Sequence, residues 1–151
     1  MAGYRTVNTL SLADAAYIAG LVDGEGTITL SRKHTNERRQ LVISVSNTEL
    51  AILDFVLRQV GAGKITTKRT VKAQHSPSFT YAIWNRQALN LLDQVAPFLR
   101  SYKSHRAQLV RDNYVRLTPR NGKYTPAGLA ARQRFEADLL AVRARTSADS
   151  R

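Results

Sequence analysis

The sequence predicts an α+β fold in which helices alternate with pairs of antiparallel strands. Residues 27–33 and 38–46 alternate polar and apolar side chains with period two, as half-buried strands do. A second pair of strand-like runs is expected near 64–71 and 78–84. Apolar runs of helical period separate the pairs. The expected order is helix, two strands, helix, two strands, helix, then C-terminal helices.

A length of 151 residues fits one domain with a substantial core. We expect this domain to span residues 1–145, with a core at about 10–117 and a C-terminal helical extension at about 118–145. Residues 146–151 are expected to be a disordered tail, because short polar chain ends are seldom held in place.

The first helix is expected to begin at Leu12, because Ser11 is followed three residues later by an acid, as in a capping box. Its small residues Ala16 and Gly20 are four apart and share one face, with Ala19 beside them. A flat face of this kind suits a second helix, and the chain has no second copy of the segment. The second copy could come from another subunit in a two-fold dimer. Alternatively, the small residues pack against the core of their own chain.

The strand pairs are expected to present one polar face that is rich in hydrogen-bonding side chains and poor in acids. Apolar residues such as Ile28, Leu30 and Ile43 point to the core instead. A face of this composition suits the edges of bases in a DNA groove. Its candidate DNA-binding residues are Thr27, Thr29, Ser31, Lys33, Arg38, Gln40, Ser44, Ser46, Lys64, Thr66, Lys68, Thr70 and Thr80.

The helices that follow the strand pairs are predicted from their start signals. A capping box at residues 46–49 is expected to open a helix that runs to about Val60. Asn85 is expected to cap the next helix, which continues through about Val95. A further helix is expected from about Tyr102.

That helix is expected to continue to about Leu117. Beyond it, Thr125 is a cap followed by Pro126 at the first helical position. The last helix is expected to reach Val142 or beyond.

The chain is strongly basic, with 23 Lys and Arg against 11 Asp and Glu and a formal net charge of +12. Such a surplus repels itself during folding but favours binding to a polyanion. No acid occurs from Phe55 to Leu92, so the charge is also uneven. The balance alone selects a class of partner, and a ribosomal-type or membrane-surface protein would share it.

Several classes of protein are disfavoured by composition. The absence of cysteine excludes disulfides and Cys-ligated zinc, and the three His match no ligand spacing. No apolar run approaches the roughly 20 residues of a membrane helix, and the N-terminus lacks the apolar region of a signal peptide. We expect an intracellular, soluble protein with no membrane partner.

Residues 18–26 end the first helix and deliver two acids, Asp23 and Glu25, to a glycine-flanked turn. Acids are disfavoured at a helix C-terminus, which carries partial negative charge. Asp23 with Gly24 could be only a helix stop. A calcium loop lacks the required ligand series. In the third interpretation a carboxylate holds Mg²⁺ beside a phosphodiester, because such ions need few protein carboxylates when phosphate completes the shell.

Residues 18–26, which read IAGLVDGEG, resemble the LAGLIDADG motif, with conservative changes at Ile18 and Val22, a glycine at Gly24 and a glutamate at Glu25. The strand order that follows resembles the single-motif, homodimeric LAGLIDADG homing endonucleases. So does the run at 96–99, APFL, which is followed closely by a Lys and a further helix. The resemblance covers roughly residues 10–117.

The resemblance implies an αββαββα core whose antiparallel sheets form a saddle over double-stranded DNA. It further implies a homodimeric endodeoxyribonuclease that uses Mg²⁺, with Ca²⁺ or Mn²⁺ as substitutes in the site. Such an enzyme makes a staggered double-strand break in a long pseudo-palindromic site. The alternative is a non-cleaving nucleic-acid-binding protein of the same fold, an intron RNA maturase or a transcription factor. A basic structural RNA-binding protein is a third option.

The same resemblance implies roles for five residues. Glu25 matches the metal-binding, catalytic acid, and the carbonyl of Gly24 is placed like a backbone metal ligand. Asp23 matches an acid that caps at the interface between two motif helices. Asn47 aligns with a polar residue that orients water, or else it merely starts a helix. Lys103 aligns with a basic residue that activates water or stabilises the transition state, or else it is a solvated phosphate contact.

Two positions depart from the family pattern. Glu25 is one methylene longer than the commoner Asp, which shifts where a metal would lie. Ala51 stands where some relatives place a basic residue early in the second helix, so another side chain would have to fill that role.

Overall fold

The computed structural model describes residues 6–68 and 77–145. Its elements confirm the predicted α+β class and the predicted alternation of helices with strand pairs. They are α1 (Leu12–Glu25), β1 (Gly26–Ser31), β2 (Gln40–Asn47), α2 (Leu50–Val60), β3 (Lys64–Lys68), β4 (Ser78–Trp84), α3 (Asn85–Val95), a short 3₁₀ turn (Ala96–Phe98), α4 (Lys103–Asn113) and α5 (Pro126–Ala141).

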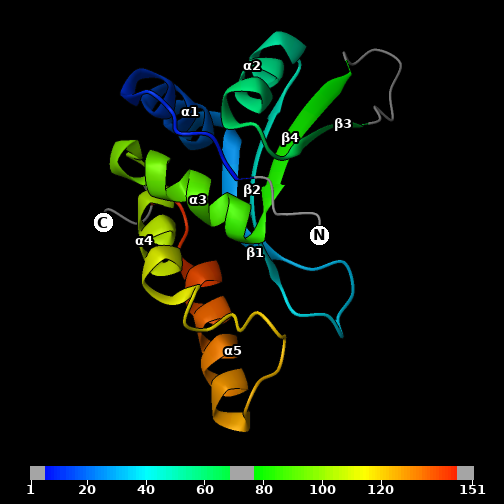
Figure 1. Ribbon diagram of the computed structural model, residues 1–151, viewed down its shortest axis with the longest axis vertical. Helices are drawn as coiled ribbons and strands as arrows, with labels where there is room; N and C mark the ends of the chain where they lie inside the picture. Colours follow the sequence, from blue (N-terminus) through cyan, green and yellow to red (C-terminus); the bar gives the residue numbers. More distant parts are fainter. Residues whose placement is uncertain (1–5, 69–76, 146–151) are drawn as a thin grey trace.

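The four strands form one antiparallel sheet in the order β1-β2-β4-β3 (Figure 1). The two hairpins join through β2 and β4, so that Ile28 pairs with Ile43 and Ile43 pairs with Ile83. These three side chains are buried on one face of the sheet. Helices α1, α2 and α3 pack against this face, which leaves the other face to the polar residues of the strands.

A single hydrophobic cluster extends from Leu10, ahead of α1, to Leu139 in α5. Helices α4 and α5 contact each other, and both contact the edge strand β1. Phe135 of α5 belongs to the same cluster, so the C-terminal helix shares the core of the strand-bearing part. Within residues 6–68 and 77–145, no helix has the length and apolarity of a membrane span.

Two helix starts match their sequence signals and two do not. Helix α1 begins at Leu12, and the Ser11 hydroxyl accepts the N–H of Asp14 at 3.1 Å. Thr125 likewise caps α5. The capping box predicted at residues 46–49 is wrong. Ser46 belongs to β2, its hydroxyl lies 2.8 Å from that of Thr80, and α2 starts at Leu50 with no side-chain cap.

The predicted cap at Asn85 is also wrong. Asn85 is the first residue of α3, its φ is 55°, and its side-chain oxygen accepts the hydroxyl of Tyr114 at 3.4 Å. Trp84 occupies the cap position without a side-chain bond. The strand predicted to reach residue 71 is described only to Lys68, and Thr70 and the tail at 146–151 lie outside the described residues.

Candidate metal and nucleic-acid site

Helix α1 passes directly into strand β1 with no intervening loop, because Gly26 allows two backbones to approach closely. A Cβ at Gly26 would lie 2.7 Å from the Cα of Val22 and 2.8 Å from the carbonyl oxygen of Ser44. The backbone there is already extended, at φ −112° and ψ −178°. Glu25, the last helical residue, is therefore held where the helix meets the sheet.

Glu25 is exposed, and Asn47 at the end of β2 holds one of its carboxylate oxygens. The Asn47 side-chain amide donates to Glu25 Oε2 at 2.5 Å. The Asn47 oxygen accepts the backbone N–H of Glu49 at 2.7 Å, which turns the amide nitrogen toward Glu25. The structure thus brings together two of the three residues that the sequence suggested as catalytic.

Asp23, two residues earlier, is turned toward the loop that precedes α4. Its carboxylate accepts the backbone N–H of Arg100 at 2.8 Å, that of Ser101 at 3.1 Å, and the Ser101 hydroxyl. Burial by itself raises the pKa of the Asp23 carboxyl. These three bonds and the nearby Lys103 charge outweigh that effect and lower its pKa below the ordinary value. Asp23 is bonded to its own chain and has little capacity for a metal.

Lys103 is the first residue of α4, and its side chain lies against the end of α1. Only 7% of the residue is exposed, so it is not the solvated lysine of the simpler interpretation. Its ammonium group donates to the carbonyls of Val22 at 2.7 Å and Asp23 at 2.9 Å. A cation is favourable there, because the last carbonyls of a helix carry partial negative charge.

Burial lowers the pKa of the Lys103 ammonium group below its ordinary value, and the nearby Arg106 charge acts in the same direction. The negative Asp23 opposes this by raising the pKa. The end of α1 and the start of α4 are thus bonded in both directions. The Asp23 side chain accepts from the backbone before α4, and the Lys103 side chain donates to the backbone of α1.

The small residues of α1 divide between the core and the surface. Ala19 is 0% exposed and packs inside the core of its own chain. Ala16 is partly exposed and Gly20 is exposed. A Cβ at Gly20 or Gly24 would meet no atom of residues 6–68 or 77–145 within 4 Å. The open face of α1 thus contains Ala16, Gly20 and Gly24, and it does not contain Ala19.

The polar face of the sheet is ordered in rows by the strand register. Thr27, Ser44, Ala82 and Lys64 are consecutive partners across all four strands. A second row joins Ser46, Thr80 and Thr66, and Ser31 pairs with Gln40 at the end of the first hairpin. Thr29, which is half-buried, is on the same face. Lys68 pairs with Ser78.

Two apolar side chains interrupt this polar face. Val42 lies on it but is buried, paired with Thr29 and Trp84. The ammonium group of Lys64 lies 5.4 Å from the centre of the Trp84 ring. An apolar patch therefore interrupts the hydrogen-bonding residues.

Two of the candidate DNA-binding cations belong to the segment that joins β1 to β2. Lys33 and Arg38 are both exposed there. The guanidinium of Arg38 lies 4.3 Å from the centre of the Tyr124 ring, so this cation stacks on a residue of the C-terminal extension.

One chain alone supplies few candidate metal ligands. Among residues 6–68 and 77–145 there is no group of three or more His, Cys, Asp or Glu that could hold a metal ion. Glu25 has an exposed carboxylate, and Gly24 lies next to it on the open face of α1. This donor set fits a hard divalent cation whose remaining ligands come from outside the chain, such as water and phosphate oxygens.

The profile of a family described as the LAGLIDADG-like domain matches residues 13–117. The solved structures that are similar include the homing endonuclease I-CvuI in complex with its target, with a TM-score of 0.70 and 18% identity over 90% of this chain and 85% of that one. The archaeal intron-encoded homing endonuclease I-Vdi141I complexed with DNA has a TM-score of 0.68 and 20% identity over 89% and 86%.

A third similar structure is the LAGLIDADG meganuclease I-AabMI bound to uncleaved DNA, with a TM-score of 0.64 and 19% identity over 89% of this chain but 46% of that one. At these identities the structural matches establish the fold. No curated protein is similar enough in sequence to count as a match.

Proposed function

The chain belongs to the LAGLIDADG-like domain family, and on that premise we propose that it is a site-specific DNA endonuclease that acts as a homodimer. Its substrate is a long pseudo-palindromic duplex, in which it makes a staggered double-strand break by hydrolysing one phosphodiester in each strand. Two copies of α1 meet along the open face of Ala16, Gly20 and Gly24, as a two-fold dimer requires the same surface of both subunits.

One observation carries the proposal: Glu25 is exposed where α1 meets the polar face of the sheet, and Asn47 orients its carboxylate. An unpaired acid is unfavourable on a surface that binds phosphate, because like charges repel. Its presence is accounted for if Glu25 and the Gly24 carbonyl hold a divalent cation. Mg²⁺ is the natural choice, and Ca²⁺ or Mn²⁺ could take its place.

A divalent cation in such a site supplies charge stabilisation at the phosphodiester. The residues of the chain position the reaction around it. Asn47 fixes the rotamer of Glu25 and presents polar atoms to a water molecule. The contacts of Lys103 support a positioning role, in which it holds the last turn of α1, rather than direct activation of water.

DNA recognition is assigned to the polar face of the sheet. Its Ser, Thr and Gln side chains can donate to and accept from base edges, and its Lys and Arg side chains can contact phosphate. Arg38 and Lys33 at the hairpin end, and Lys64 at the far strand, are the exposed cations that support this assignment. The net charge of +12 adds a sequence-independent attraction to the polyanion.

A second candidate function is a non-cleaving nucleic-acid-binding protein of the same fold, such as an intron RNA maturase or a transcription factor. The specific observation in its favour is Lys103, whose ammonium group already bonds two carbonyls of its own chain. If that lysine must be free to act on water, the present arrangement supports binding without cutting.

The deciding experiment is a selection of cleaved and of bound sites from a randomised duplex library, performed in Mg²⁺ and in Ca²⁺. The endonuclease proposal predicts a palindromic cleaved site in Mg²⁺ and tight binding in both ions. A parallel preparation of Glu25→Gln controls for contaminating nuclease, because it should bind the same site without cutting it. Binding in both ions with cutting in neither would establish the second candidate.

A further inference from the structure

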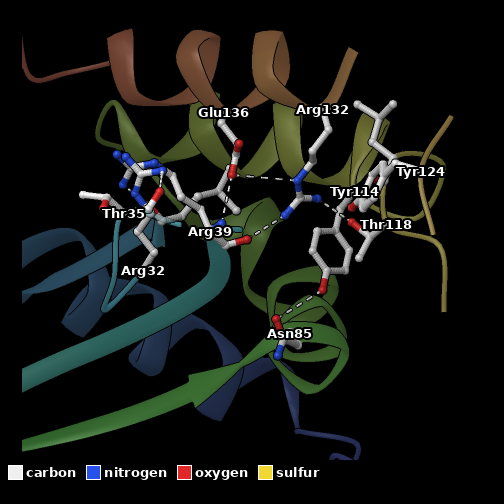
Figure 2. Close-up of polar contacts among 11 residues, drawn as sticks. Arg32, Thr35, Arg39, Asn85, Tyr114, Thr118, Tyr124, Arg132 and Glu136 are labelled. Atoms are coloured by element: carbon white, nitrogen blue, oxygen red, sulfur yellow. Dashed lines mark hydrogen bonds and ion pairs between the residues drawn. The ribbon is translucent and has the colours of Figure 1, made fainter. Parts of the chain in front are cut away.

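Arg132 in α5 is a buried cation in a part of the chain that the family profile does not cover. Only 2% of the residue is exposed. Its Nη1 donates to the Thr118 hydroxyl, and its Nη2 donates to the backbone carbonyl of Arg39 at 2.8 Å (Figure 2). Arg39 is the last residue before β2. A buried charge in α5 thus holds the hairpin segment where the strand resumes.

Glu136, one turn further along α5, holds the same residue by its other backbone group. The backbone N–H of Arg39 donates to Glu136 Oε1 at 3.1 Å. The same carboxylate oxygen lies 4.0 Å from Nε of Arg132, an atom that has no hydrogen-bond partner among the described residues (Figure 2). The two side chains therefore bond the N–H and the carbonyl of Arg39, and each offsets the charge of the other.

The edge strand β1 is held from the same side by two arginines. The Arg39 side chain donates to the carbonyl of Leu30 at 3.3 Å. Arg106 of α4 donates to the carbonyl of Ile28 at 2.9 Å and to that of Val142, just after α5, at 2.8 Å. Carbonyls on the free edge of an edge strand otherwise need water or another strand. Here guanidinium groups satisfy them and tie the strand to the two C-terminal helices.

A third contact lies outside the core. The guanidinium of Arg38 lies 4.3 Å from the ring centre of Tyr124, a residue in the segment between α4 and α5. The Tyr124 hydroxyl donates to the carbonyl of Leu117 at 3.0 Å, which fixes the ring. Arg38 and Arg39 are therefore both engaged by the C-terminal extension, one on the surface and one in the interior.

We propose that α5 sets the position of the β1–β2 hairpin end, residues 32–39, on the DNA, and that Arg132 and Glu136 are positioning residues for sequence discrimination there. The inference deepens the proposed function, on which it rests. Neither residue contacts DNA. Each acts through the backbone of Arg39, and so determines where the exposed Lys33 and Arg38 lie.

The distance along the hairpin separates this effect from the chemistry. Six residues lie between Glu25 and Arg32, and a strand rises about 3.3 Å per residue, so the hairpin end is roughly 20 Å from Glu25. At about 3.4 Å per nucleotide along one strand of DNA, that separation is about six base pairs. A displaced hairpin end should alter discrimination about six or more base pairs from the cut and spare positions next to it.

The test compares three variants with the unaltered protein. Arg132→Met removes the buried cation. Glu136→Ala removes the acceptor for Arg39 and is the milder change, in case the first variant fails to fold. Arg134→Met is the matched control, because it removes the same charge from an exposed position two residues further along α5. Each is measured for hydrogen exchange in residues 32–39, for kcat at saturating DNA, and for cleavage of every single-base-pair substitution in the selected site.

In the unaltered protein a wrong base pair read by the hairpin end should lower cleavage by about tenfold or more. In Arg132→Met and Glu136→Ala that penalty should fall to within about twofold for the outer base pairs only, with kcat on the matched site within about twofold and faster exchange at residues 32–39. Arg134→Met should resemble the unaltered protein in all three measurements.

If hydrogen exchange is faster but base-pair discrimination is unchanged, the specificity role is overturned. If exchange is unchanged in both variants, Arg132 and Glu136 do not hold the hairpin end. A uniform loss at all base pairs would show general destabilisation and would also overturn the proposal. If the unaltered protein cuts no DNA, the proposed function fails. The exchange measurement, which needs no DNA, still decides whether α5 holds the hairpin.

Discussion

The two ends of the β1–β2 hairpin use charged residues in opposite ways. At the end next to α1, Glu25 is exposed and its carboxylate accepts the side-chain amide of Asn47. At the end next to α5, Arg132 is buried, Glu136 is half-buried, and together they bond both backbone groups of Arg39. Charge is left open at the first end and is largely enclosed at the second.

On the proposed function, one chain completes only one of these two ends. The described residues hold no cluster of three potential metal ligands near Glu25, and none of them lies within 4 Å of a Cβ added at Gly20 or Gly24 beside it. The α5 end draws all of its partners from the same chain. The proposed chemistry therefore depends on a second subunit and on DNA, whereas the position of the hairpin end does not.

The largest expected effect comes from removing the open charge. Glu25→Gln keeps the size of the side chain but removes the negative oxygen that would hold the cation. Cleavage should fall by at least about a thousandfold, since a metal contributes several kcal/mol to such a transition state. Binding of the selected site in Ca²⁺ should stay within about twofold to threefold. Single-turnover cleavage and filter binding measure the two quantities. Full activity in this variant would refute the metal role of Glu25.

Removing the enclosed charge should instead lower stability. Arg132→Met leaves the half-buried Glu136 carboxylate without its neighbouring cation and the Arg39 carbonyl without its donor. The free energy of unfolding should fall by about 3 kcal/mol, at the lower end for a broken buried pair because the Arg132–Glu136 contact is long, at 4.0 Å.

Urea unfolding followed by circular dichroism measures this loss. Arg134→Met, exposed on the same helix, should stay within about 0.5 kcal/mol of the unaltered protein. Equal midpoints for the two variants would contradict the enclosed role of Arg132.

Removing the Lys103 ammonium group, which bonds the last turn of α1 next to Glu25, should have an intermediate effect on stability. Lys103→Met leaves two carbonyls at the end of α1 without a donor, and stability should fall by about 2 kcal/mol in urea unfolding. The exposed Lys123→Met is the control and should stay within about 0.5 kcal/mol. If Lys103 acts by position, cleavage at saturating DNA should keep the pH profile of the unaltered protein. If the rise or the fall of the cleavage rate with pH disappears in Lys103→Met, Lys103 takes part directly in proton transfer.

The requirement for a second subunit can be tested at Gly20. Because an added Cβ there meets none of the described residues within 4 Å, Gly20→Ala and Gly20→Leu should leave the monomer as stable or raise its stability by up to about 1 kcal/mol. In a dimer packed on α1 the larger side chain separates the two helices, so the dissociation constant should rise by about tenfold or more with Leu, and less with Ala. Sedimentation at several concentrations measures both. A dimer unaffected by Leu would place its interface elsewhere.

Local features of the fold could be predicted from sequence because they depend on neighbouring residues. The period-two pattern identified the strands and their faces, and Ser11 and Thr125 marked two helix starts correctly. The capping box at residues 46–49 failed because pairing with Thr80 keeps Ser46 in the sheet. Where a strand and a cap compete for one residue, the partner strand decides, and that partner is distant in sequence.

The hydrogen-bond partners that position the candidate site could not be predicted either, because they too are distant in sequence. Asp23 was expected to cap at an interface between subunits, but the donors that the structure shows are Arg100 and Ser101, with Ser101 lying 78 residues away. Arg132 and the carbonyl of Arg39 are 93 residues apart. A single sequence shows many arginines, and no local pattern indicates which of them is buried. Ala19 was likewise misplaced by its small size, which fits a core as well as an interface.

The smallest expected effect is a dependence of stability on acid pH at Asp23. The pKa of its carboxyl in the folded chain lies below the ordinary 3.8, so the unfolded chain binds this proton at a higher pH than the folded chain does. The contribution of Asp23 is therefore complete above the ordinary pKa and is lost as the pH falls through the lower folded pKa. Asp23→Asn should flatten the decline of the unfolding free energy between about pH 5 and about pH 2. Ser101→Ala, which removes one of the bonds that lower the pKa, should flatten it in part. If the unfolding free energy of all three proteins falls equally at acid pH, the pKa of Asp23 is the same in the folded and the unfolded chain.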